Sequence, residues 1–223
     1  MRYEEKFDGG NLNHICPLCN GHECLDYFQD QRRQYFQCSQ CCLVFVDPSQ
    51  RLSALEEKSE YDLHENSIDN RDYRQFLSRL FDPLVLKIKP QSKGLDFGCG
   101  PGPALSSMFE ESGFLMKKYD VFYDYRPNVL LENYDFITAT EVVEHLFSPG
   151  EVIEGLWQQL SSGGILGLMT KLLSDPKAFS HWHYKNDQTH VCFFSQESFR
   201  WLSRRLNARL EIVGNDVILL YKK

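Results

Sequence analysis

The chain of 223 residues has no long apolar run, no internal repeat and no excess of basic residues. A membrane-spanning helix needs about 20 consecutive apolar residues, and no segment approaches that length. The segment from Met1 to Lys6 lacks the basic-then-apolar order of a signal peptide, so we expect a cytoplasmic protein without a membrane partner. The formal net charge of −7 disfavours nucleic acid as a partner on bulk electrostatics.

Cysteine is unevenly placed, because six of the eight cysteines lie between Cys16 and Cys42. Cys16 with Cys19, and Cys38 with Cys41, form two C-x₂-C pairs separated by 18 residues. This spacing is a strong zinc signature, and four thiolates complete a closed tetrahedron, so the pattern predicts a structural Zn²⁺ rather than a catalytic one. Two disulfides are the competing interpretation, which a cytosolic setting disfavours.

The length of 223 residues is enough for one α/β domain with a small appendage, and the 42% of hydrophobic residues supports a real core. Residues 1–50 are interpreted as a zinc-ribbon-like module that is too small to fold without its metal. Residues 51–92 are predicted to form a helical linker or cover, and residues 93–223 to form the main domain. In that domain Ser148, Pro149 and Glu151 predict a helix that begins with a capping box.

The segment from Leu95 to Gly102 is the most informative part of the sequence. A short apolar strand runs into three glycines at alternate positions, and a helix-like stretch from Pro103 to Ser112 follows. Strand, glycine turn and helix in this order predict a nucleotide-type pocket at the carboxyl edge of a parallel sheet. Asp96 in this turn would repel a phosphate and suit a cationic ligand, such as the sulfonium compound S-adenosylmethionine.

Asp96, Gly98, Gly100 and Gly102 resemble the first signature of the class I S-adenosylmethionine-dependent methyltransferases, acid-x-Gly-x-Gly-x-Gly. The resemblance runs from about Asp69 to the C-terminus. It implies a doubly wound, mostly parallel seven-stranded α/β sheet that ends in an antiparallel hairpin. The hairpin is also expected from the short turn between the apolar runs 210–213 and 217–221, because strands joined so closely pair antiparallel.

The resemblance implies where the cofactor binds. Asp120 follows the glycine turn by about 20 residues and is the candidate for the ribose hydroxyls, with Asp124 as the weaker alternative. Thr140 and Glu141, in a motif that resembles the fourth strand of the family, are expected beside the methionine part. His145 is interpreted first as a structural histidine bonded to the backbone. The third strand is poorly defined, so the adenine contacts are not assigned.

The stretch from Trp182 to Val191 looks like one in a group of uncharacterised methyltransferases that also carry an N-terminal cysteine ribbon. Tyr61, Asp62, His64 and Asn66 resemble the same group. Loops at this sheet edge carry function, so we predict His190 as the base or acceptor-orienting group, held by Asp187. His183 and Tyr184 are second choices. The competing interpretation is that these side chains only fix a lid by hydrogen bonds.

Three functions remain open. The first is transfer of a methyl group from S-adenosylmethionine to a small molecule by in-line displacement. The second is methylation of RNA with the ribbon as the binding module, although Arg32 and Arg33 are the only basic residues between 16 and 46. The third is a scaffold that binds the cofactor and a protein partner without turnover. The sequence does not give the oligomeric state.

Overall fold

The computed structural model describes residues 14–63 and 67–223, so the predictions made for His64 and Asn66 lie outside the described residues. The helices are α1 (Ala54–Tyr61), α2 (Arg71–Val85), α3 (Ala104–Glu111), α4 (Pro149–Gln159) and α5 (Gln196–Arg205), with short 3₁₀ helices η1 (Pro48–Gln50), η2 (Pro127–Leu131), η3 (Pro176–His181) and η4 (His183–Asn186). The strands are β1 (Cys24–Gln29), β2 (Gln34–Cys38), β3 (Val44–Val46), β4 (Lys93–Phe97), β5 (Leu115–Tyr119), β6 (Tyr134–Thr140), β7 (Leu160–Met169), β8 (Cys192–Phe193), β9 (Arg209–Val213) and β10 (Val217–Tyr221). Among the described residues, no helix has both the length and the apolar character that crossing a bilayer requires.

The larger sheet has six strands within the described part of the chain, in the order β5-β4-β6-β7-β10-β9. The first four strands are mutually parallel, and β10 pairs antiparallel with both β7 and β9. The expected parallel sheet with a final hairpin is therefore confirmed, but the count of seven strands is wrong. The segment between β5 and β6 is too short for another strand with its own crossover, which takes about a dozen residues, and it forms a turn and η2 instead.

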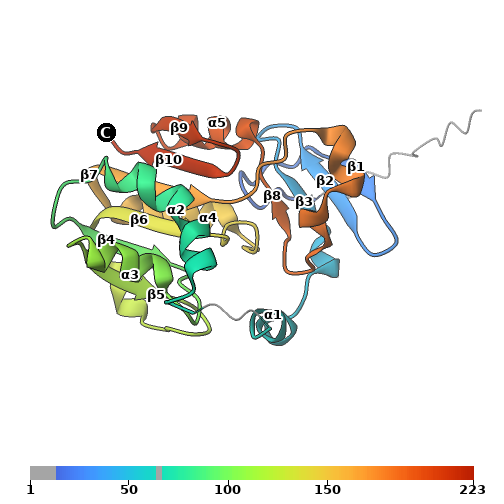
Figure 1. Ribbon diagram of the computed structural model, residues 1–223. Coiled ribbons are helices and arrows are strands. Elements are labelled where there is room, and N and C mark those ends of the chain that lie inside the picture. Colours follow the sequence, from blue (N-terminus) through green and yellow to red (C-terminus); the bar gives the residue numbers. More distant parts are fainter. Residues whose placement is uncertain (1–13, 64–66) are drawn as a thin grey trace, which may run out of the picture.

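Helices cover both faces of this sheet (Figure 1). Leu80 of α2 and Phe109 of α3 pack in one apolar cluster with Phe136 of β6. The neighbouring residue of β6, Ile137, belongs to a second cluster with Ile153 of α4 and residues of α5. Adjacent residues of a strand point to opposite faces, so these two clusters mark the two sides of a doubly wound sheet.

The smaller sheet has the antiparallel order β1-β2-β3-β8, and of the two cysteine pairs only Cys38, at the end of β2, lies in a strand. Its last strand comes from far along the chain, because Val44 pairs with Phe193 and Phe45 with Cys192. Buried residues of this sheet share one continuous apolar cluster with α4 and α5. The predicted division of the chain into residues 1–50, 51–92 and 93–223 stays a prediction. Strand β8 shows that residues of the segment 93–223 complete the sheet formed by residues 1–50.

The first turn of α4 packs directly on the N-terminal module. The Gly150 amide donates to the Pro17 carbonyl at 3.2 Å, and a Cβ atom on Gly150 would lie 2.3 Å from the Leu18 carbonyl oxygen. Ser148 is the N-cap residue but its side chain accepts no capping hydrogen bond, so the predicted capping box is wrong. A helix N-terminus needs acceptors for its exposed amides, and the neighbouring module supplies one here.

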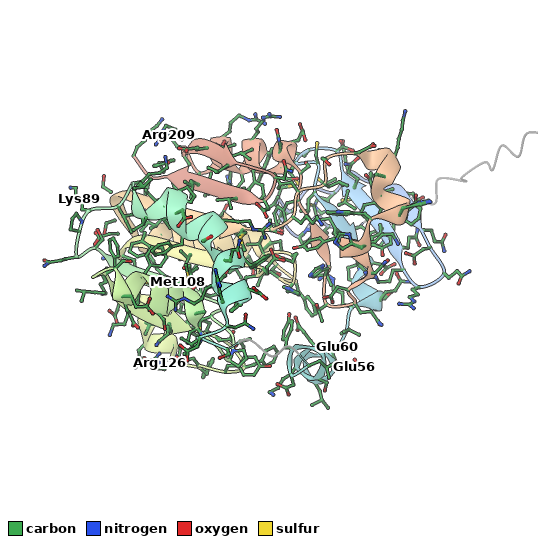
Figure 2. All side chains as sticks on the ribbon, viewed as in Figure 1. Glu56, Glu60, Lys89, Met108, Arg126 and Arg209 are labelled. Carbon is green, nitrogen blue, oxygen red and sulfur yellow. The ribbon has the colours of Figure 1, made fainter. Side chains whose placement is uncertain are left out.

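Helix α1 lies beside the main domain, at the same lower edge of the view as the turn that follows β5. Figure 2 shows this arrangement through the labelled side chains of Glu56 and Glu60 on α1 and of Arg126 beyond β5. The Tyr123 hydroxyl donates to the Asp62 carboxylate at 2.6 Å, which joins the end of α1 to that turn. Helix α1 begins with a complete capping box between Ser53 and Glu56.

Candidate functional site

A cavity of about 750 Å³ lies at the carboxyl ends of β4, β5 and β6, and residues of α1 line one side of it. This volume falls within the range of small-molecule sites, which is roughly 300–1,000 Å³. Its polar wall includes the glycine turn, four carboxylates and two histidines, and its apolar wall is mostly aromatic. The lining residues used below are Glu57, Tyr61, Gly98, Gly100, Asp120, Thr140, Glu141, Val142, His145, Asp187 and His190.

The glycine turn after β4 forms one side of the cavity. Gly98 and Gly100 have φ angles of 73° and 63°, a left-handed conformation that favours glycine. A Cβ atom on Gly98 would lie 2.4 Å from the Val142 side chain, whereas a Cβ on Gly100 would meet nothing within 4 Å. The backbone at Gly100 is therefore open to close approach by a ligand, while Gly102 does not line the cavity.

Asp96 lies behind the glycine turn and does not line the cavity. Its side chain is 2% exposed and accepts hydrogen bonds from Thr138 Oγ1 at 2.8 Å and Ser106 Oγ at 2.9 Å. Burial raises the pKa of this carboxyl to about 6. The structure therefore shows Asp96 joining β4 to α3 and β6, so it is not placed to face a ligand in the cavity.

Asp120 lines the cavity at the end of β5 and connects two loops. It accepts from the backbone amides of Gly100 at 2.9 Å, Phe122 at 2.8 Å and Tyr123 at 3.0 Å. A carboxylate offers about four lone-pair sites, so these three bonds still leave capacity for a ligand hydroxyl. Asp124, the alternative, is paired with Arg126 and does not line the cavity.

Thr140 and Glu141 line the cavity where β6 ends. Glu141 has a φ of 52°, which is unusual for a residue other than glycine and is typical of strain held at functional sites. Its amide donates to the Met169 carbonyl at 2.8 Å, which fixes this conformation. Burial raises the pKa of the Glu141 carboxyl to about 7.

Two of the four residues predicted from the 182–191 stretch reach the cavity. His190 Nε2 lies 3.7 Å from Asp187 Oδ2, and both residues line the wall. Burial opposes ionisation of Asp187, but its hydrogen bonds from Thr189 and the nearby His190 outweigh this effect and lower its pKa. His183 is exposed with its Nε2 3.0 Å from Lys171 Nζ, and Tyr184 is buried behind the wall, so neither lines the cavity.

The loop that carries Asp187 and His190 is held by the N-terminal module. The buried guanidinium of Arg33 donates to the main-chain carbonyls of Lys185, Asp187, Gln188 and His190, the last at 2.8 Å. Lys185, itself 5% exposed, forms an ion pair with Asp30 at 2.7 Å. The module therefore fixes the backbone of one cavity wall.

The four predicted cysteine ligands come together. Cys16 and Cys41 have their Sγ atoms 3.4 Å apart, as do Cys19 and Cys38, and all four sulfurs lie within 4.8 Å of one another. The two turns are alike, because Asn20 and Cys42 each follow a pair with a φ near 60° and donate to the carbonyl of the first cysteine of that pair. Cys24 and Cys42 lie outside the group.

The family of the chain follows from comparison with known proteins. Residues 66–211 match the family model described as a methyltransferase domain, which is well over half of the chain. The chain belongs to this methyltransferase family. With the signature and sheet described above, it is a class I S-adenosylmethionine-dependent methyltransferase.

Solved structures support the fold of this methyltransferase. Magnesium protoporphyrin IX methyltransferase from Synechocystis PCC 6803, with bound SAH, is 12% identical over 76% of this chain and 94% of its own, with a TM-score of 0.53. A SAM-dependent methyltransferase from Archaeoglobus fulgidus is 14% identical over 67% and 94%, with a TM-score of 0.53. The plantazolicin methyltransferase in complex with SAH is 15% identical over 79% and 91%, with a TM-score of 0.52. No protein of curated function matches the methyltransferase significantly.

Sequence reasoning assigned no role in the site to three residues that shape it. Tyr61 lines the cavity from α1, Arg33 holds the loop, and Glu144 lies wholly buried beside His145 and His190. Glu144 had the clearest sequence signal, because it is a second acid three residues after Glu141, across two valines, and stands directly before His145. Arg33 gave none, since its partners are main-chain carbonyls about 155 residues away.

Proposed function

We propose that this S-adenosylmethionine-dependent methyltransferase methylates a small molecule inside the described cavity. The observation that supports this proposal is the charge of the wall: it contains Glu57, Asp120, Glu141 and Asp187, and none of the described lining residues is Lys or Arg. Such a wall suits a cofactor with a sulfonium and an ammonium group, and an acceptor that is neutral or cationic. It disfavours phosphate, which positively charged side chains normally bind.

The cofactor would lie across the glycine turn. Gly98 and Gly100 would allow close backbone approach, and Asp120 would accept from the ribose hydroxyls. Thr140 and Glu141 would contact the methionine part, with the Glu141 carboxylate beside its positive charge. Asp96 and Gly102 would act from behind, because they shape the turn without lining the cavity.

The chemistry is a displacement at the methyl carbon. A lone pair of the acceptor forms the new bond to that carbon, and the carbon–sulfur bond breaks with its electron pair passing to sulfur. The acceptor proton must then leave, and His190 would accept it or orient the acceptor, with Asp187 Oδ2 3.7 Å from its Nε2 to stabilise the imidazolium that forms. Tyr184 and His183 would not contact the substrate. Tyr184 packs behind the cavity wall and supports it, and His183 lies outside the cavity.

The four cysteines would hold a structural Zn²⁺. Their sulfurs are close enough for one ion, two matched turns present them, and four thiolates leave no open position for a water molecule. The ribbon is less suited to RNA, because the Arg33 guanidinium is buried and its donors are used within the protein. A cytoplasmic location, which would keep the thiols reduced, stays a prediction.

The test combines cofactor binding with product formation. Calorimetry should detect SAH binding to the wild type, and Asp120→Asn should weaken it at least tenfold, whereas the matched Asp124→Asn should not. Incubation with methyl-labelled cofactor and either fractionated metabolites or RNA should label a metabolite. Label in RNA alone would reject the small-molecule proposal, and cofactor binding without any labelled product would favour the scaffold.

A further inference from the structure

Glu144, His145 and His190 form a second cluster of metal-ligating side chains, distinct from the four cysteines. One carboxylate oxygen of Glu144 and one ring nitrogen of each histidine lie within 4.8 Å of one another. The first two residues follow β6 and the third lies in the loop fixed by Arg33, so the fold brings together two segments about 45 residues apart. Both histidines line the cavity.

Glu144 is buried without full compensation. Its side chain is 0% exposed, and its Oε1 accepts a hydrogen bond from the Tyr184 hydroxyl. Its Oε2 has no hydrogen-bond partner among the described residues. Burying a carboxylate oxygen in this way is costly unless a proton or a cation is bound to it, and the two neighbouring imidazoles make a cation possible here.

The histidines are held in the orientation typical of metal ligands. His145 Nδ1 lies 3.2 Å from the Thr189 carbonyl, and His190 Nδ1 lies 2.7 Å from the Tyr184 carbonyl. A carbonyl only accepts, so each Nδ1 carries the proton and, in the neutral ring, the lone pair is on Nε2. Histidines that bind metals commonly donate their other nitrogen to a carbonyl in this manner.

The surroundings favour positive charge. Glu141 and Asp187 lie in the cavity wall nearby, and none of the described lining residues is Lys or Arg. The Glu141 and Glu144 carboxyls both contact the Tyr184 hydroxyl.

We propose that Glu144, His145 and His190 bind a divalent cation of the Zn²⁺, Mn²⁺ or Fe²⁺ class in the acceptor part of the cavity. Two imidazoles and one carboxylate are a donor set that suits these ions and leaves positions open for a further ligand. The proposal rests on the proposed function for its acceptor, which would be a molecule with an oxygen or nitrogen donor that occupies an open position. His190 then orients the acceptor through the cation, and the acceptor proton passes to a carboxylate of the cavity wall, Glu141 or Asp187.

The test measures metal binding without turnover. Protein with its cysteine-bound zinc is dialysed against a weak chelator, its remaining metal is counted, and Mn²⁺ is added, because this ion prefers nitrogen and oxygen to thiolate ligands. Electron paramagnetic resonance should show about one bound Mn²⁺ per chain with coupling to imidazole nitrogen. A second metal that resists dialysis and is lost from the variants below would support the site equally.

The isosteric Glu144→Gln and the variant His145→Ala should each weaken Mn²⁺ binding at least tenfold. The matched controls are His181→Ala and Glu197→Gln, whose side chains are exposed and lie outside the cluster. Absence of bound metal beyond the zinc in the wild type, or unchanged binding in Glu144→Gln, would overturn the site. SAH calorimetry on the same samples separates the two proposals. If the wild type does not bind SAH, the cofactor site is refuted, whereas the result for metal binding is unaffected.

Discussion

Two aspartates at neighbouring strand ends show how much depends on the direction of one side chain. Asp96 and Asp120 both follow apolar residues of parallel strands, yet Asp96 turns into the protein towards Ser106 and Thr138, and Asp120 turns towards the cavity. The first therefore contributes to the shape of the glycine turn. The second joins that turn to the next loop and can still contact a ligand.

Asp96 should make stability depend on pH. Burial raises its folded pKa to about 6, above the usual aspartate value of 3.8, so its contribution is fully present below pH 3.8 and is lost as pH rises to about 6. Between pH 5 and 7 the wild type should lose about 1 kcal/mol more unfolding free energy than Asp96→Asn. Urea unfolding at both pH values measures this, and identical pH dependence of the two proteins would contradict it.

Cys41 and Cys42 are adjacent but should differ in their effect on zinc. Cys41 is buried in the four-sulfur group, whereas Cys42 lies outside it with a φ of 59°. Cys41→Ser should lose the metal and lower Tm by roughly 10 °C or more, because a structural zinc contributes several kcal/mol.

Cys42→Asn is the matched control, since asparagine tolerates this left-handed backbone and Asn20 stands at the equivalent position of the other turn. It should keep one zinc per chain and an unchanged or higher Tm. Metal analysis with thermal melts measures both variants, and loss of zinc from Cys42→Asn would show that the ligand set has been assigned incorrectly.

At the scale of elements, the hairpin of β1 and β2 presents Arg33 to the loop of the site. Arg33→Ala removes donors to four carbonyls, so the amides of residues 187–191 should exchange hydrogen faster. Methyl transfer should fall roughly 10- to 100-fold, because small displacements of a positioned group are costly.

The affinity of the Arg33→Ala variant for SAH should stay within about twofold, because the glycine turn and Asp120 belong to another wall. The neighbouring Arg32 is exposed, so Arg32→Ala should leave exchange, transfer and affinity unchanged. Equal exchange rates in the Arg33→Ala variant and the wild type would show that the hairpin does not hold the loop.

Elements whose signal is local could be predicted from the sequence. The expected strand 217–221 has the bounds of β10, and this stretch is strongly apolar and follows the polar turn 214–216. The cysteine pairs and the glycine turn were equally clear, because the spacing of these residues in the sequence determines the local turn that they form. The pairing of β3 with β8, the contact of Gly150 with Leu18 and the inward direction of Asp96 could not be predicted, since each depends on residues distant in the chain.

At the scale of the whole molecule, one apolar cluster runs from Cys16 in the N-terminal module through Ile153 of α4 to Leu220 of β10. A shared core favours a single cooperative transition, so calorimetry of the zinc-loaded protein should show one peak. Removal of zinc by a strong chelator should shift this whole peak to lower temperature. Two resolved peaks, of which only the smaller responds to chelation, would contradict the shared core.

The pairing of β3 with β8 also bears on how the protein is made. The ribosome releases Val46 about 150 residues before Phe193, which is roughly 7–30 s at ordinary elongation rates. During that interval the β3 edge has no partner strand, and unpaired edges invite contact with other nascent chains. The β3 edge of the newly made module therefore stays exposed until the segment that contains β8 emerges.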